Sequence, residues 1–191
     1  LRDIQAAAQA GKCLLTVEDP VEAVLPGVTQ SQVNRAAGFD YVVVDMQHGL
    51  SDYTHVVAMV QAMARTGAVP VVRVPWNEQG IIGRALDAGA FGVIIPMVNT
   101  PDEARRAVEA CRYAPDGLRS IGPLVTRLRH GANFPFVAND VVACIPMIET
   151  REAVGNVDEI LAVPGIDAVY VGPADLSMSY GLVPAPDHDG D

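Results

Sequence analysis

Four apolar runs in this sequence each end on, or just before, a side chain that could take part in chemistry. They are YVVVD before His48, VPVVR ending on Arg73, ACIPMI before Glu149 and AVYVGPA before Asp175. An imidazole can move protons, a guanidinium can hold an anion, and two carboxylates can share a cation. In a parallel β/α barrel the carboxyl ends of different strands meet at one site, so this layout predicts an enzyme of that architecture.

Six short β-branched runs, alternating with segments of helical period, would position these side chains. The runs are nearly continuous in apolar residues, which suits parallel strands covered on both faces. Thr100-Pro101 and Glu149-Thr150 have the composition of helix starts, and Gly89 that of a helix end. The stretch 115–139 breaks the rhythm and is either a functional loop or carries short helices. The expected strands are 13–17, 41–45, 69–74, 91–96, 141–148 and 167–172.

These elements predict the α/β class and a single β/α barrel domain over residues 1–191. A TIM-type (β/α)8 barrel needs eight strands and about 250 residues. We therefore expect a barrel truncated after about six strand-helix units, with its C-terminal part missing. The acidic tail 187–191 superficially resembles a metal motif, but its composition favours a solvated segment.

Composition limits the function. The chain has 191 residues, half of them apolar, and a net charge of −10. This charge argues against nucleic acid and anionic membranes as partners. Without an apolar run of about 18 residues or an N-terminal apolar region, we expect neither a membrane span nor a signal peptide, and a cytoplasmic location. Cys13, Cys111 and Cys144 are too few and too far apart for a disulfide framework or zinc site, and we expect buried thiols.

Glu149 and Asp175 are the candidate metal ligands. They follow two successive predicted strands, and neighbouring strands in a barrel lie about 5 Å apart, so both carboxylates could reach one ion. Such hard oxygen ligands suit Mg²⁺ or Mn²⁺. The alternative is that Glu149 merely lies in a first helical turn and Asp175 is an N-cap.

Arg73 and His48 also allow two interpretations. Arg73 needs an anionic partner at the end of an apolar strand, either a substrate oxygen or an internal salt bridge to Asp45 or Glu149. His48 could move a proton through a metal-bound water, or it is simply solvated in its loop. Gly172 begins a turn whose N–H groups could bind a carboxylate, or it only makes the turn.

Three long segments together resemble the HpcH/HpaI aldolase/citrate lyase family. They are FDYVVVDMQHGLSD, then VPVVRVPWNEQGIIGRALDAGAFGVIIPMVNTPDEARRAVEACRYAPDGLRSIGP, then MIETREAVGNVDEILAVPGIDAVYVGPADLSMSYG. The similarity runs from about Gly38 to Gly181 and keeps the order of the motifs. It implies a class II, pyruvate-forming aldolase built as a β/α barrel and dependent on Mg²⁺, Mn²⁺ or Co²⁺.

The resemblance also implies a role for each matching residue. Glu149 and Asp175 would hold the metal, Arg73 would steady the enolate, and His48 would be catalytic. Asp87 corresponds to the aspartate partner of that histidine, although a carboxylate near a helix C-terminus is disfavoured by the dipole. The substrate contacts would be Arg73, Gly172, Ala174 and Met147.

Two positions depart from the family pattern. Gln47 stands where some members have glutamate before the histidine, and Met147 stands where some have glutamine. Both positions lie close to the expected site, so these departures affect the aldehyde partner and the turnover more than the reaction class.

The expected reaction is the cleavage of 4-hydroxy-2-oxo acids into pyruvate and an aldehyde, or their formation from these two compounds. The single lysine, Lys12, does not lie at a strand end, which argues against a Schiff-base aldolase. A malyl-CoA or citramalyl-CoA-type lyase stays open because Arg127, Arg129 and His130 could meet a coenzyme A phosphate. A non-catalytic barrel fragment serving as a binding or subunit module is the third possibility. The resemblance further implies a homo-oligomer, commonly a hexamer.

Overall fold

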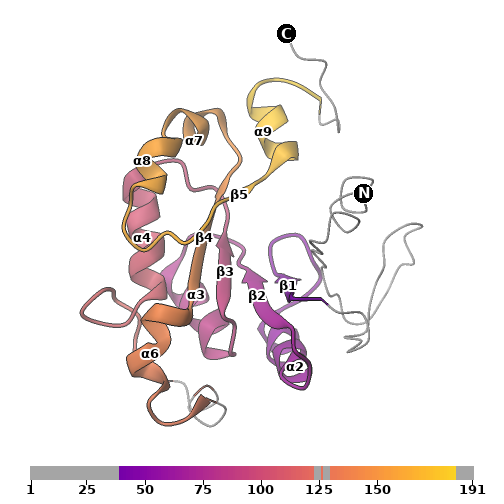
Figure 1. Cartoon of the computed structure of the whole chain (residues 1–191). Helices are drawn as coiled ribbons and strands as arrows, with labels where there is room; N and C mark the ends of the chain where they lie inside the picture. The colour runs from indigo at the N-terminus through magenta and orange to yellow at the C-terminus, as the bar shows by residue number, and fades with distance from the viewer. Residues whose placement is uncertain (1–38, 123–125, 127–129, 184–191) are drawn as a thin grey trace.

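The computed structural model describes residues 39–122, 126 and 130–183. The sequence-predicted strand 13–17, Cys13, Lys12, Arg127, Arg129 and the acidic tail lie outside these residues. The five later strands expected from the sequence are all present (Figure 1). They are β1 (Tyr41–Asp45), β2 (Val69–Arg73), β3 (Gly92–Ile95), β4 (Ala143–Ile148) and β5 (Tyr170–Val171).

These strands form one parallel, curled sheet whose spatial order, β1-β2-β3-β4-β5, is also the order along the chain. Each strand pairs with the next in parallel register, as in Asp45 opposite Arg73 and Ile148 opposite Val171. Sequential parallel order requires a crossover between successive strands, and helices supply these connections. The expected α/β class is confirmed, and all carboxyl ends of the strands lie at one edge of the sheet.

The helices of the described residues follow local signals in the sequence. Thr100 caps α4 through a capping box with Glu103, and Pro101 takes the first helical position, as expected. Gly89 has the positive φ of 108° that suits the end of α3. The helices are α2 (Tyr53–Met63), α3 (Gln79–Asp87), α4 (Pro101–Cys111), α6 (Phe134–Val141), α7 (Arg151–Gly155), α8 (Val157–Leu161) and α9 (Pro173–Ser179).

One helix differs in detail from the sequence prediction, and one of the two forms expected for the irregular stretch is confirmed. The helix expected after Glu149-Thr150 is divided at Asn156, whose backbone is not helical (φ −107°, ψ 9°). The Asn156 side chain donates instead to the carbonyl oxygen of Asn99 at 2.8 Å, and such polar contacts compete with helix continuation. The irregular stretch 115–139 carries a short helix, since α6 begins at Phe134.

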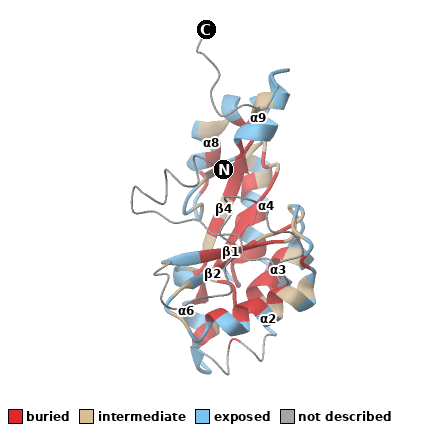
Figure 2. Cartoon of the chain, turned by 90° about the vertical axis from the view of Figure 1, so that its right-hand side faces the viewer, coloured by how far each residue is buried: buried red, intermediate tan, exposed pale blue. Residues whose placement is uncertain are grey.

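The core lies between one face of the sheet and its helices. Valines on β1 and β2 pack with Met63 of α2, Leu86 of α3 and Ile160 of α8 in one continuous buried cluster. Figure 2 shows these buried segments as the inward sides of the helices and the middle of the strands. Cys111 and Cys144 lie in this cluster as free, buried thiols, as predicted.

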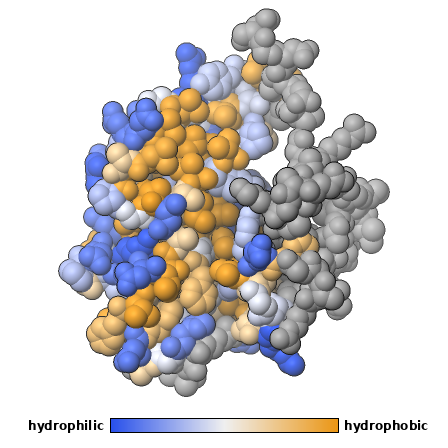
Figure 3. All heavy atoms as spheres, in the orientation of Figure 1, coloured by the Kyte–Doolittle hydropathy of each residue, from blue (hydrophilic) through white to orange (hydrophobic). Residues whose placement is uncertain are grey.

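The opposite face of the sheet carries a smaller cluster made of Val43, Val71, Ile94 and Met147. Large hydrophobic side chains are also exposed on the outside, among them Val154, Leu161 and Phe136. Figure 3 shows hydrophobic residues gathered over α7 and α8 and again over α6. No helix within the described residues is both long and apolar enough to cross a bilayer.

Candidate active site

Asp45 and Arg73 form an ion pair at the carboxyl ends of β1 and β2. The two residues are register partners, so their side chains leave the sheet next to each other. Nε of Arg73 donates to Oδ1 of Asp45 at 2.8 Å, and Nη2 donates to Oδ2. The same Oδ1 accepts the backbone N–H groups of Gln47 at 2.9 Å and His48 at 3.3 Å. The internal salt bridge to Asp45, one of the two interpretations of Arg73, is therefore present.

This ion pair keeps both partners charged. Burial raises the pKa of Asp45, but the Arg73 guanidinium and the two backbone N–H groups outweigh it and hold that pKa below its usual range. Burial lowers the pKa of Arg73, but the hydrogen bonds and charge of Asp45, together with the charges of Tyr170 and Glu149, outweigh it and raise that pKa. Among the described contacts the pair uses only Nε and Nη2 of Arg73, so Nη1 can still meet a substrate oxygen.

Glu149 directly follows β4 and is only 1 % exposed. Its Oε1 accepts the backbone N–H of Met97 at 2.6 Å, from the loop that follows β3. Its Oε2 is buried as well and has no hydrogen-bond partner within the described residues. A buried carboxylate oxygen without a partner is costly when ionised, so this atom marks a position for a cation or a proton.

The electrostatics of Glu149 show which charged groups surround it. Burial raises the pKa of Glu149 most, and the Asp175 carboxylate raises it further. The Met97 N–H, the Arg73 guanidinium and His48 act in the opposite direction. The fold therefore brings His48, Arg73, Glu149 and Asp175 within electrostatic range of one another at the carboxyl edge of the sheet.

The two remaining members of this group are open to solvent. Asp175 is exposed in the first turn of α9, and His48 is exposed in the loop after β1. Within residues 39–183, gaps aside, no three His, Cys, Asp or Glu side chains are arranged to hold a metal ion. The candidate ligand set is therefore the carboxylate pair of Glu149 and Asp175, with the remaining coordination positions open to water and substrate.

Gly172 lets the chain pass close to Glu149. Its N–H donates to the carbonyl oxygen of Ile148 at 3.1 Å, which extends the pairing of β4 and β5. A Cβ atom at this position would lie 2.7 Å from Oε2 and 2.8 Å from Cβ of Glu149. A side chain at this position would therefore have to displace Glu149 or the turn itself, whether or not Gly172 also contacts substrate.

The two other expected substrate contacts lie on either side of Gly172. Met147 is buried with Val43 and Ile94 on the face of the sheet opposite the main core, and its Cε would lie 3.2 Å from a Cβ on Gly172. Ala174 is exposed in the first turn of α9.

Asp87 is placed differently. It is the last residue of α3, and a helix that crosses from the end of β2 to the start of β3 ends near the amino edge of the sheet. Its Oδ1 accepts a hydrogen bond from Nη2 of Arg119 at 2.9 Å. The Arg119 side chain is 1 % exposed and stacks on the ring of Tyr113 at 4.4 Å. No described contact joins Asp87 to His48, so this pairing stays a prediction.

Comparison with known proteins connects this geometry to a family. The sequence model of the HpcH/HpaI aldolase/citrate lyase family matches residues 25–190. The chain belongs to this family. The resemblance seen in the sequence is thereby confirmed.

Two curated HpcH/HpaI relatives and one solved structure illustrate the match. The chain is 45 % identical over 163 residues to a hydroxypyruvate/pyruvate aldolase of Rhizorhabdus wittichii, covering 85 % of this chain and 65 % of the relative. It is 43 % identical over 155 residues to a 4-hydroxy-2-oxo-heptane-1,7-dioate aldolase of Salmonella typhimurium, covering 80 % and 59 %. The chain thus spans less than two thirds of the length of these relatives.

The solved structure is that of an HpcH/HpaI aldolase/citrate lyase family protein from Burkholderia cenocepacia. It is 32 % identical, with a TM-score of 0.77 over 92 % of this chain and 69 % of that chain. At this identity and coverage, the likeness shows that the described sheet and helices are arranged as in that family member.

The residues present fit the divalent cation that HpcH/HpaI membership implies. The buried Oε2 of Glu149 lacks a partner, and Asp175 adds a second, solvent-facing carboxylate within electrostatic range. Carboxylate oxygens with open coordination positions beside them suit Mg²⁺, Mn²⁺ or Co²⁺. A closed tetrahedral site would suit these ions less well.

Two residues of this site were not predicted as site residues. Asp45 was considered only as an internal partner of Arg73, yet its position opposite Arg73 on neighbouring strands is a signal that the sequence carries. Met97 gave no such signal, because its contribution is a backbone N–H. That contribution depends on the conformation of a loop, which periodicity does not reveal.

Proposed function

We propose that this protein is a divalent-metal-dependent class II aldolase that cleaves or forms 4-hydroxy-2-oxo acids through a pyruvate enolate. The observation that carries the proposal is Oε2 of Glu149, which is buried and unpartnered within electrostatic range of Asp175, Arg73 and His48. Both curated relatives are named as aldolases, one for hydroxypyruvate and pyruvate and one for 4-hydroxy-2-oxo-heptane-1,7-dioate. These names support a 2-oxo acid as the substrate class.

Each side chain of the site has a distinct part in this proposal. Glu149 and Asp175 would hold the cation, which when bound supplies Lewis-acid polarisation of the 2-oxo acid. Arg73 places a fixed positive charge where negative charge develops on the enolate oxygen, and its ion pair with Asp45 holds the guanidinium in place. His48 would accept the proton of the 4-hydroxyl group, through a water, as the C3–C4 bond breaks.

The supporting residues follow from the same proposal. Gly172, Ala174 and Met147 would contact the substrate. Asp87 would orient His48. Within the described residues, its carboxylate is bonded to Arg119.

We further propose that the described sheet is part of a (β/α)8 barrel and that residues 1–191 belong to one domain. The sequential parallel order and the second, inner cluster on the sheet support a barrel. Assembly into a homo-oligomer and a cytoplasmic location stay predictions.

Exchange of the methyl protons of pyruvate with D₂O, followed by NMR, tests the proposed function. Enolisation at this site should produce Mg²⁺-dependent exchange that EDTA abolishes and that Glu149→Ala lacks. Glu152→Ala is the matched control, because Glu152 is an exposed glutamate on α7 only three positions further along. This control should exchange at the rate of the unchanged protein.

Two results would contradict the proposal. Exchange that persists in EDTA would show that the reaction does not need a metal ion. Absence of exchange with Mg²⁺, Mn²⁺ and Co²⁺ would favour a lyase for a coenzyme A ester or a non-catalytic binding module.

A further inference from the structure

Met97 has an unusual backbone. Among the described residues it is the one non-glycine residue with a positive φ, 56°. Residues with a Cβ atom seldom adopt this left-handed conformation, and they keep it only where surrounding contacts hold them. Met97 lies between β3 and α4, and its side chain is only partly buried, so apolar packing alone does not account for its conformation.

The backbone N–H of Met97 is the group that this conformation places. It donates to Oε1 of Glu149 at 2.6 Å and is the described hydrogen bond that fixes this carboxylate. With Oε1 held by Met97 from the loop after β3, the direction of the unpartnered Oε2 is set as well. Whatever holds Met97 therefore determines where the second oxygen of Glu149 points.

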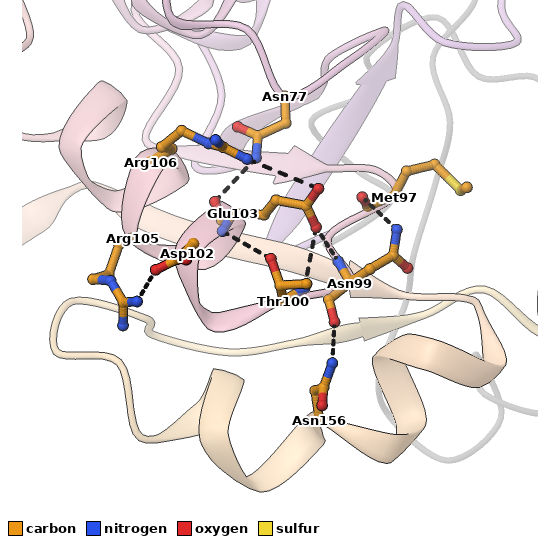
Figure 4. A network of polar contacts seen from close by, with 9 residues as sticks. All are labelled: Asn77, Met97, Asn99, Thr100, Asp102, Glu103, Arg105, Arg106 and Asn156. Carbon is orange, nitrogen blue, oxygen red and sulfur yellow. Dashed lines mark hydrogen bonds and ion pairs between the residues drawn. The ribbon is translucent and has the colours of Figure 1, made fainter.

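Asn99 is bonded through all four of its polar groups, and Figure 4 shows three of these bonds. Its Nδ2 donates to the carbonyl oxygen of Met97 at 3.2 Å, and its N–H donates to Oε2 of Glu103 at 2.7 Å. Its own carbonyl oxygen accepts from Nδ2 of Asn156 at 2.8 Å. Outside the view of Figure 4, its Oδ1 accepts from Oγ1 of Thr150. Thr150 is the residue that follows Glu149, so Asn99 contacts the two loops that meet at the carboxylate.

We infer that Asn99 is a positioning residue for Glu149: it holds Met97 in the left-handed conformation from which the Met97 N–H fixes the carboxylate. The inference rests on the proposed function, in which Glu149 is a metal ligand. Helix capping of α4 explains the bond from Asn99 N–H to Glu103, because the capping carboxylate takes that bond. It does not explain why the Asn99 side chain reaches back to Met97 and across to Thr150.

The first test is independent of metal. Labelling with ¹⁵N-methionine gives at most six amide signals, since the chain has six methionines. The Met97 amide should lie downfield, as expected for a short bond to a carboxylate, and should move upfield and lose exchange protection in Asn99→Ala. Asn77→Ala is the matched control, because Asn77 donates to the carbonyl oxygen of Glu103 in the same network but does not contact Met97.

The second test measures binding of Mn²⁺ alone by calorimetry. Asn99→Ala should weaken binding about 10- to 100-fold, as loss of a partner behind a metal ligand commonly does, whereas Asn77→Ala should leave it unchanged. The double variant Met97→Gly, Asn99→Ala should recover part of the loss, because glycine adopts positive φ without strain. A general loss of folding in Asn99→Ala would not be repaired by glycine at position 97.

The outcomes separate the two proposals. If the unchanged protein binds no Mn²⁺, the proposed function fails, while the Met97 amide signal still decides whether Asn99 holds the loop. If the protein binds Mn²⁺ and Asn99→Ala binds it equally well, or if the Met97 amide is unmoved, the inference about Asn99 is wrong and the proposed function stands. Failure of the glycine variant to recover any affinity would also overturn it.

Discussion

Glu149 is a side chain whose burial costs stability in the absence of a cation. Its pKa is raised, mainly by burial, so between its ordinary value of 4.5 and its folded value the folded protein binds more protons than the unfolded chain. Stability from this group therefore falls as pH rises through that window. Residues that serve a ligand commonly carry such a cost, because the site is built for the bound state.

Glu149→Gln should therefore make the metal-free protein more stable at neutral pH while abolishing Mn²⁺ binding. Glutamine keeps the shape of the side chain and an acceptor for the Met97 N–H but carries no charge. Urea unfolding in EDTA at pH 7.5 and at pH 4 measures the difference, which should vanish at the lower pH. Glu152→Gln on the exposed side of α7 should change stability by less than about 0.5 kcal/mol at both pH values. A variant less stable than the unchanged protein at pH 7.5 would show that Glu149 is stabilised by contacts outside those described.

Asp45 has the opposite pH behaviour. Its pKa is lowered in spite of burial. Its contribution to the free energy of unfolding is therefore fully present above the ordinary pKa of 3.8 and is lost as pH falls through the pKa of the folded state. Asp45→Asn should cost about 2 kcal/mol at pH 7, because a charged hydrogen-bonded pair is broken and Arg73 loses its anion. The cost measured by urea unfolding should shrink below about pH 4, where the wild-type carboxylate itself becomes protonated.

An exposed pair provides the control for that prediction. Asp102 and Arg105 pair on the surface of α4, with side chains 77 % and 55 % exposed. Asp102→Asn should cost less than about 1 kcal/mol, since solvent screens such pairs. Equal costs at Asp45 and Asp102 would mean that the carboxyl edge of the sheet is as accessible to water as the outer helix surface.

At the scale of elements, the β5–α9 turn passes close to the residue that follows β4. Gly172→Ala would place a Cβ 2.7 Å from Oε2 and 2.8 Å from Cβ of Glu149. We expect a loss of about 1–3 kcal/mol, as in other overpacked sites, together with weaker Mn²⁺ binding. Gly83→Ala is the matched control, because a Cβ there meets nothing within 4 Å and lies inside α3.

Gly83→Ala should raise stability by about 0.5–1 kcal/mol through helix propensity. Both variants can be compared by thermal unfolding and Mn²⁺ calorimetry. If Gly172→Ala is tolerated in both measurements, the turn can move away from Glu149, and the close approach is not required for the site.

The elements that the sequence predicted well are those with a strong local signal. Continuous apolar runs such as YVVVD define the strands, and Thr100-Pro101 defines a helix start, because local composition determines both. The break at Asn156 and the left-handed Met97 could not be predicted, since each depends on a partner distant in sequence. The placement of Arg73 was left open for the same reason: an isolated run cannot show whether the anion opposite it belongs to the protein or to a substrate.

At the scale of the whole molecule, one buried cluster extends from the first described helix to the last crossover. Met63 of α2 and Ile160 of α8 are both fully buried in it, although 97 positions separate them. A cluster shared in this way should make the described elements unfold together, as the single-domain prediction requires. Truncating either side chain to alanine should cost about 2–5 kcal/mol.

Met63→Ala and Ile160→Ala should therefore each shift the same single unfolding transition in urea. Far-UV circular dichroism reports on the helices, and fluorescence of Trp76, the one tryptophan of the chain, reports on the loop after β2. Coincident transitions by both probes in both variants are expected of one cooperative unit. The contrary result is two separate transitions, in which Met63→Ala shifts only the fluorescence change and Ile160→Ala shifts only part of the circular dichroism change. This result would show that the chain unfolds in two parts. The sheet would then consist of two units that fold independently, and Asp45–Arg73 would belong to a different unit from Glu149.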